Sequence, residues 1–185
     1  MSNVSPDNLP EAWTEAVLRF HCPRYAEFPQ VELYMDQVLK VIEHSLAPID
    51  KGGKEKLITS TMVNNYVKQG VVQPPQKKRY NRNHLAYLMV VCVLKQVLPI
   101  ADICRGIRLQ IDTCPIAQAY DYFCEALESA LVAVFTKNSA AFIEQPSGTL
   151  PEAQLVRAAT LAFANKVYLQ TYLQYVEEVT QGAEN

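Results

Sequence analysis

Four positive charges occur within six positions of the segment QGVVQPPQKKRYNRNHLAYL, residues 69–88. Lys and Arg side chains at this density either bind an anion such as a phosphate or form a solvated turn. The chain as a whole has 17 basic and 19 acidic residues, yet Glu55 is the one acid among eight basic residues in 51–82. This asymmetry favours a localised anionic partner for the basic residues of the segment, which are Lys77, Lys78, Arg79 and Arg82.

A second group of polar residues precedes the basic segment, in TSTMVNNYVKQG, residues 59–70. The Thr/Ser start and Gly70 predict a short capped helix between them. Helical spacing places Met62, Val63, Tyr66 and Val67 inside. Asparagine can hydrogen-bond both N6 and N7 of adenine, although it can equally be a plain surface residue or stabilise the last helical turn. The candidate DNA-contacting side chains on the outer face are Thr61, Asn64, Asn65 and Lys68.

Together, residues 59–104 predict a winged helix-turn-helix, in which a short helix enters the major groove and a basic arm contacts phosphates. The segment TMVNNYVKQGVVQPPQKKRYNRNHLAYLMVVCVLKQVLPIADI resembles this element of MerR-type regulators. That resemblance implies binding to double-stranded DNA. Asn65 and Lys78 stand where arginine is usual in that family. The matching positions are Tyr66, Gly70, Lys78 with Tyr80, Leu85, Leu88, Leu94 and Ile103.

A wider stretch, from ELYMDQV (32–38) to ADI (101–103), resembles an uncharacterised bacterial family called domain of unknown function 1836. The shared elements are LYMDQV, MVNNYVK and KKRY. This resemblance implies a fold and a mode of binding, but no reaction.

Other chemistry has little support in the sequence. No phosphate loop, nucleophile elbow or dinucleotide fingerprint occurs, so we expect neither an enzyme nor a cofactor. The odd number of cysteines, without Cys-x-x-Cys spacing, predicts free, buried thiols and no metal site. Three carboxylates on one predicted helix face, Asp121, Glu125 and Glu128, are interpreted as solvent-facing acids. The five cysteines are Cys22, Cys92, Cys104, Cys114 and Cys124.

The elements that must position these residues are predominantly helical. The predicted fold class is all-α, a MerR-like winged helix-turn-helix with a small β wing, in which Val71–Val72 could form a strand, plus a C-terminal helical segment. Asn81 or Asn83 is expected to cap the helix that follows the wing. The predicted helices cover residues 11–20, 30–46, 59–70, about 82–98, 99–107, 113–135 and 151–180.

Three segments follow from this pattern: an irregular N-terminal arm (1–30), the winged helix-turn-helix (31–110) and a C-terminal helical segment (111–185). The last helix is apolar on more than one side, which indicates either packing on 113–135 or a homodimer. The polar N-terminus and short apolar runs predict a cytoplasmic protein without membrane contact. We expect a DNA-binding transcriptional regulator; the alternative is a non-catalytic protein- or ligand-binding module with a degenerate helix-turn-helix.

Overall fold

The computed structural model describes residues 9–51, 56–111, 114–138 and 151–183, and this part of the chain is helical without a strand. The all-α prediction is therefore confirmed for the described residues. The helices are α1 (Glu11–Leu18), a short 3-10 helix (Tyr25–Glu27), α2 (Met35–Leu46), α3 (Ser60–Lys68), α4 (Arg82–Leu94), α5 (Ile100–Ile111), α6 (Ile116–Thr136) and α8 (Pro151–Ala183).

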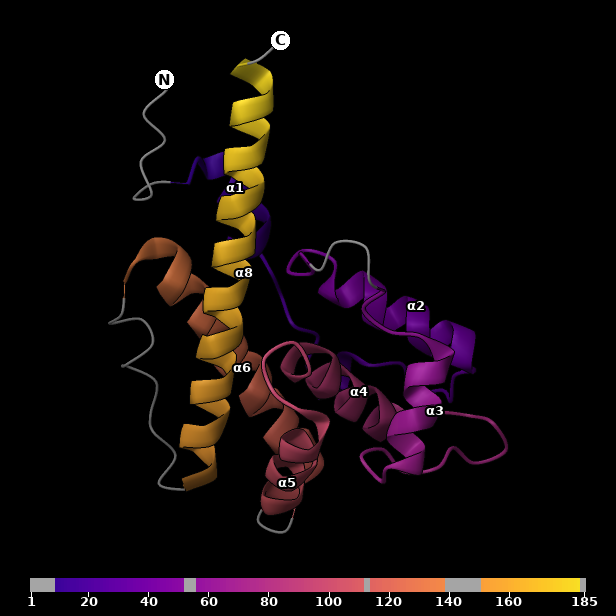
Figure 1. Ribbon diagram of the computed structural model, residues 1–185. Coiled ribbons are helices and arrows are strands. Elements are labelled where there is room, and N and C mark those ends of the chain that lie inside the picture. Colours follow the sequence, from indigo (N-terminus) through magenta and orange to yellow (C-terminus); the bar gives the residue numbers. More distant parts are fainter. Residues whose placement is uncertain (1–8, 52–55, 112–113, 139–150, 184–185) are drawn as a thin grey trace.

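The long helices α6 and α8 pack along each other on one side of the molecule, and α2 and α3 lie on the opposite side (Figure 1). The apolar helix α4 joins these halves, since it packs against α2, α6 and α8. Its side chains Leu88, Met89 and Val91 are fully buried. One continuous apolar core thus supports both the basic segment and the C-terminal helices. The division of the chain into segments 1–30, 31–110 and 111–185 stays a prediction.

The start of α2 differs from the prediction, because a contact with a residue distant in the sequence holds the preceding residues in an extended conformation. The predicted helix 30–46 begins only at Met35, and Val31 and Tyr34, which precede it, are exposed. Leu33 instead pairs with Tyr80 in an antiparallel bridge, with N–O distances of 2.8 and 2.9 Å. An extended backbone at Leu33 satisfies these hydrogen bonds, and a helix there could not.

Helix α4 also ends early, at Leu94 rather than near residue 98. The next residues form tight turns, in which the Leu98 N–H donates to the carbonyl of Leu94 at 2.8 Å. The helical conformation is disfavoured before a proline, here Pro99. Lys95, at the end of α4, donates from Nζ to the carbonyl oxygen of Leu57 at 2.5 Å and so holds the chain that leads into α3.

The predicted β wing does not form strands in the described part of the chain. Val71 and Val72 are buried, but their N–H groups donate to the carbonyl of Tyr66 at the end of α3 rather than to a neighbouring strand. Two isolated bridges, Leu33–Tyr80 and Gln76–Arg79, replace the predicted hairpin. The wing is therefore a loop closed by a tight turn.

The packing of α8 on α6 confirms one of the two alternatives for the C-terminal helix. The rings of Phe135 and Tyr168 stack edge to face at 5.3 Å, and Phe163 and Val167 are buried. A different side of α8 carries exposed apolar side chains at Leu155, Leu169 and Leu173.

Within the described residues, no helix combines the length and the apolar character needed to cross a membrane.

Candidate functional site

Helix α3 forms where the capping residues predict it. The Thr59 hydroxyl accepts a hydrogen bond from the Met62 N–H at 3.2 Å, which satisfies one of the free N–H groups of the first turn. Gly70 follows the helix with φ +72°, a left-handed conformation that glycine adopts without strain. The chain therefore leaves α3 sharply, and the segment that follows turns back over its last carbonyls.

The two faces of α3 differ as the helical spacing predicts. Val63 and Tyr66 are buried, and burial raises the pKa of Tyr66 to about 12, so this hydroxyl stays neutral. The outer face is exposed, and its side chains make no hydrogen bond or ion pair with other described residues. We call it the α3 face; it consists of Thr61, Asn64, Asn65 and Lys68.

The second group of predicted residues forms a tight turn, Gln76–Arg79, which we call the basic turn. Its two central residues have positive φ, 48° at Lys77 and 63° at Lys78, and the Arg79 N–H donates to the Gln76 carbonyl at 2.8 Å. Lysine rarely adopts this conformation, for which Asn-Gly is preferred. The side chains of both lysines are exposed and have no partner in the described part of the chain.

The two arginines of the predicted site have contacts of their own. Arg79 donates to the Tyr34 hydroxyl at 2.8 Å, and its guanidinium lies 4.6 Å from the centre of that ring. Arg82 is half-buried at the start of α4, 5.9 Å from the ring centre of Tyr25, and its Nε finds no acceptor among the described residues. Lys77 and Lys78 are therefore the freest of the four charges.

Buried aromatic residues anchor the basic turn to the core. Tyr80 is buried and stacks edge to face on His84 at 5.3 Å. The Asn81 side chain accepts from the N–H groups of Asn83 and His84, and His84 Nδ1 accepts from the Asn81 N–H at 3.0 Å. This reciprocal cap fixes the end of the turn to α4.

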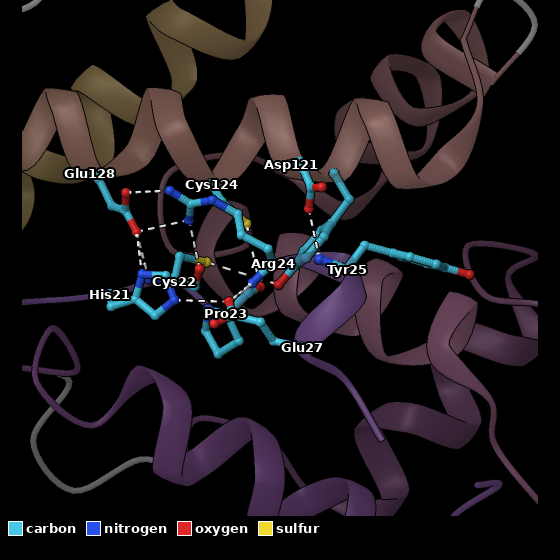
Figure 2. Close-up of polar contacts among 10 residues, drawn as sticks. His21, Cys22, Pro23, Arg24, Tyr25, Glu27, Asp121, Cys124 and Glu128 are labelled. Atoms are coloured by element: carbon cyan, nitrogen blue, oxygen red, sulfur yellow. Dashed lines mark hydrogen bonds and ion pairs between the residues drawn. The ribbon is translucent and has the colours of Figure 1, made fainter. Parts of the chain in front are cut away.

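A second polar cluster, which we call the clasp, holds the N-terminal arm against α6 (Figure 2). Arg24 binds Glu128 through two hydrogen bonds, Nη1–Oε1 at 2.8 Å and Nη2–Oε2 at 2.6 Å. The Cys22 N–H donates to the same Oε1 at 2.8 Å. Burial alone would raise the pKa of Glu128, but these donors lower it below its usual value. The clasp consists of His21, Cys22, Arg24, Tyr25, Glu27, Asp121 and Glu128.

Further contacts extend the clasp toward α4. The Tyr25 N–H donates to Asp121 Oδ1 at 2.7 Å, and the Tyr25 hydroxyl donates to Asn83 Oδ1 at 2.6 Å. The interpretation of Asp121 and Glu128 as solvent-facing acids is therefore wrong, because both are half-buried and bind the arm. Their spacing on α6, with Cys124 between them, could have indicated a shared contact, but not that residues 21–25 supply it.

The cysteines of the chain are free thiols, and three of the five are buried. All five cysteines are free; Cys22, Cys92 and Cys124 are buried, whereas Cys104 and Cys114 are only partly so. A hydrogen bond with Cys124 and burial raise the pKa of Cys22 well above its usual value, which disfavours the reactive thiolate. No group of three His, Cys, Asp or Glu side chains in the described ranges could hold a metal ion.

Comparison with known proteins gives one match, to the family described as domain of unknown function (DUF1836), over residues 23–123. The chain belongs to this family. The match begins within the arm of the clasp, after Cys22, includes α2 to α5 and ends within α6, so it contains every residue of the α3 face and the basic turn. It is wider than the resemblance over 32–103. No curated protein and no solved structure matches the chain.

Proposed function

We propose that this member of the DUF1836 family binds double-stranded DNA as a transcriptional regulator of the winged helix-turn-helix type. The α3 face enters the major groove, where Asn64 or Asn65 hydrogen-bonds to base edges. Lys77, Lys78, Arg79 and Arg82 contact phosphates beside the groove. The resemblance to MerR-type regulators supports the same arrangement.

One observation carries this proposal: the basic turn presents two exposed lysines in a strained backbone conformation within an acidic chain. Positive φ at Lys77 and Lys78 costs on the order of 1 kcal/mol or more per residue compared with glycine. The tight turn holds both lysine side chains outward, where they can contact phosphates. The α3 face adds four polar side chains that no described residue engages.

The experiment that tests this function is selection of duplexes from a random DNA library by the full chain, followed by affinity measurements on the selected sequence. We expect an enriched motif, and Asn64→Ala or Asn65→Ala should change which bases are enriched, because at least one of the two side chains reads a base edge. A chain that retains no duplex even at low salt, but recovers a protein partner, would instead support the interaction-module alternative.

DNA-binding proteins of this type commonly occupy two half-sites about one helical turn apart as dimers. The exposed side chains Leu155, Leu169 and Leu173 of α8 support a dimer through this helix. Light scattering on the wild-type chain and on Leu169→Gln/Leu173→Gln should then give the dimer mass and the monomer mass, respectively.

A further inference from the structure

A cavity of about 610 Å³ lies between α4, α5, α6 and α8. Packing voids in protein interiors rarely exceed the size of a water molecule, whereas small-molecule sites measure about 300–1,000 Å³. The cavity opens to solvent at a rim that includes Leu109 and Leu155, and it has the size of a ligand site.

Small residues on three helices create this space. Ala86 of α4, Ala119 of α6 and Ala159 of α8 face it with little more than a methyl group each. Gly106 of α5 also lines it, and a Cβ added there would meet no heavy atom within 4 Å. Larger apolar residues such as Phe123 complete the wall. An apolar wall of this kind favours an apolar occupant.

The polar groups of the cavity lie at one edge. Asp102 and Arg105 of α5 form an ion pair at the rim, and their side chains are 40% and 78% exposed. Asp102 occupies only part of the five-donor guanidinium, and Arg108 adds a second positive charge to α5. Tyr87 also lines the cavity, and its hydroxyl bonds to no described residue. The wall is thus apolar, with the Asp102–Arg105 ion pair at its rim and Arg108 three residues beyond Arg105 on the same helix.

We propose that this cavity binds an elongated apolar molecule that ends in a carboxylate, such as a fatty acid. The chain of the ligand fills the space left by Ala86, Ala119, Gly106 and Ala159, and Arg105 binds the carboxylate at the rim. This site is separate from the α3 face and the basic turn, so it does not depend on the proposed DNA binding.

The test uses isothermal titration calorimetry of the full chain with sodium decanoate, below its micelle concentration, and with 1-decanol. Decanoate should bind at micromolar concentrations and more tightly than decanol. Arg105→Gln should weaken decanoate at least fivefold and leave decanol unchanged, because only the carboxylate contacts the arginine. Equal loss for both ligands, or no binding of decanoate at millimolar concentration, would overturn the proposal.

Two pairs of variants locate the site. Ala119→Phe should abolish decanoate binding, whereas Ala117→Phe, at a half-buried position two residues away outside the lining, should retain it.

Gly106→Leu should also abolish binding while preserving or raising thermal stability, because leucine has a higher helix propensity than glycine. Its control is Gly182→Leu on α8, which also meets open space. Undiminished binding by folded Gly106→Leu would exclude the cavity as the site.

A second copy of the chain is the other conceivable occupant, because Leu109 and Leu155 lie exposed at the rim. In that case decanoate would fail to bind to the wild type, and Gly106→Leu would lower the mass measured by light scattering. That result would contradict the proposed ligand.

Discussion

The clasp and the basic turn are both charged, yet their charges have opposite surroundings. Arg24 and Glu128 are three-quarters buried, and each satisfies the other through two hydrogen bonds. Lys77 and Lys78 are exposed, lack partners in the described part of the chain and sit on backbone that favours other residues. Charges satisfied within the chain stabilise the fold, and charges held outward at a conformational cost are available to another molecule. We therefore interpret the clasp as a structural element and propose the basic turn as a binding surface.

The largest effect that would test this contrast is on stability. Glu128→Ala should lower the free energy of unfolding by about 3 kcal/mol, because it removes the carboxylate that pairs with the three-quarters buried Arg24 and accepts from the Cys22 N–H. Urea denaturation followed by circular dichroism measures this change. The folded variant should keep the affinity of the wild type for duplex DNA.

The matched control is Glu125→Ala, an exposed carboxylate on the same helix, which should change stability by no more than about 0.5 kcal/mol. If Glu128→Ala were as mild as this control, the clasp would not hold the arm to α6.

A smaller effect of opposite sign is expected at the basic turn. Lys77→Asn/Lys78→Gly supplies the residues that positive φ prefers, so it should raise the free energy of unfolding by about 1 kcal/mol. The same variant should lose about tenfold in DNA affinity at moderate salt, because two phosphate contacts are removed. Denaturation and fluorescence anisotropy with a labelled duplex measure the two effects.

Lys137 provides the control for this variant, since it also has positive φ, 55°, at the end of α6. Lys137→Gly should likewise raise the free energy of unfolding, because glycine prefers positive φ, and it should keep the full affinity for DNA. Loss of affinity in both variants would attribute the effect to general charge rather than to the turn.

The smallest expected effect is on the pH dependence of stability, through His84, which packs against Tyr80 at the end of the basic turn. Burial lowers the pKa of His84, although carbonyl groups of Gln73 and Pro74 and the charge of Glu32 act in the opposite direction. As pH falls, His84 therefore becomes protonated in the unfolded chain at a higher pH than in the folded chain. The contribution of His84 is complete above its ordinary pKa of 6.5 and is lost progressively below it.

Unfolding measured from pH 7.5 to 5.5 should accordingly show a shallower decline in His84→Gln than in the wild type. Glutamine can still accept the hydrogen bond from the Asn81 N–H, so the cap is retained. Identical slopes would mean that His84 does not stay neutral in the fold.

The sequence predicts best those features that neighbouring residues determine. Thr59 and Gly70 bound α3 through local rules of capping and backbone conformation, and the exposed and buried faces follow from helical spacing. The wing is harder, because its form depends on the pairing of Leu33 with Tyr80, 47 positions apart along the printed sequence. That pairing also displaces the start of α2.

The clasp could not be predicted, because its decisive contact joins Arg24 to Glu128 across 104 positions. Neither residue is unusual within its own segment, so periodicity and capping carry no signal for it. The cavity escapes prediction for a similar reason, since the alanines of α4, α6 and α8 create space only after the helices have packed.

The central claim is that the basic turn contacts DNA phosphates, and the salt dependence of binding tests it most directly. The affinity of the wild type for its selected duplex, plotted as log K against log salt, should fall with a slope of about −0.9 per phosphate contact. In Lys77→Gln/Lys78→Gln the slope should be shallower by about 1.8, for two lost contacts. An unchanged slope and affinity in this folded variant would contradict the account.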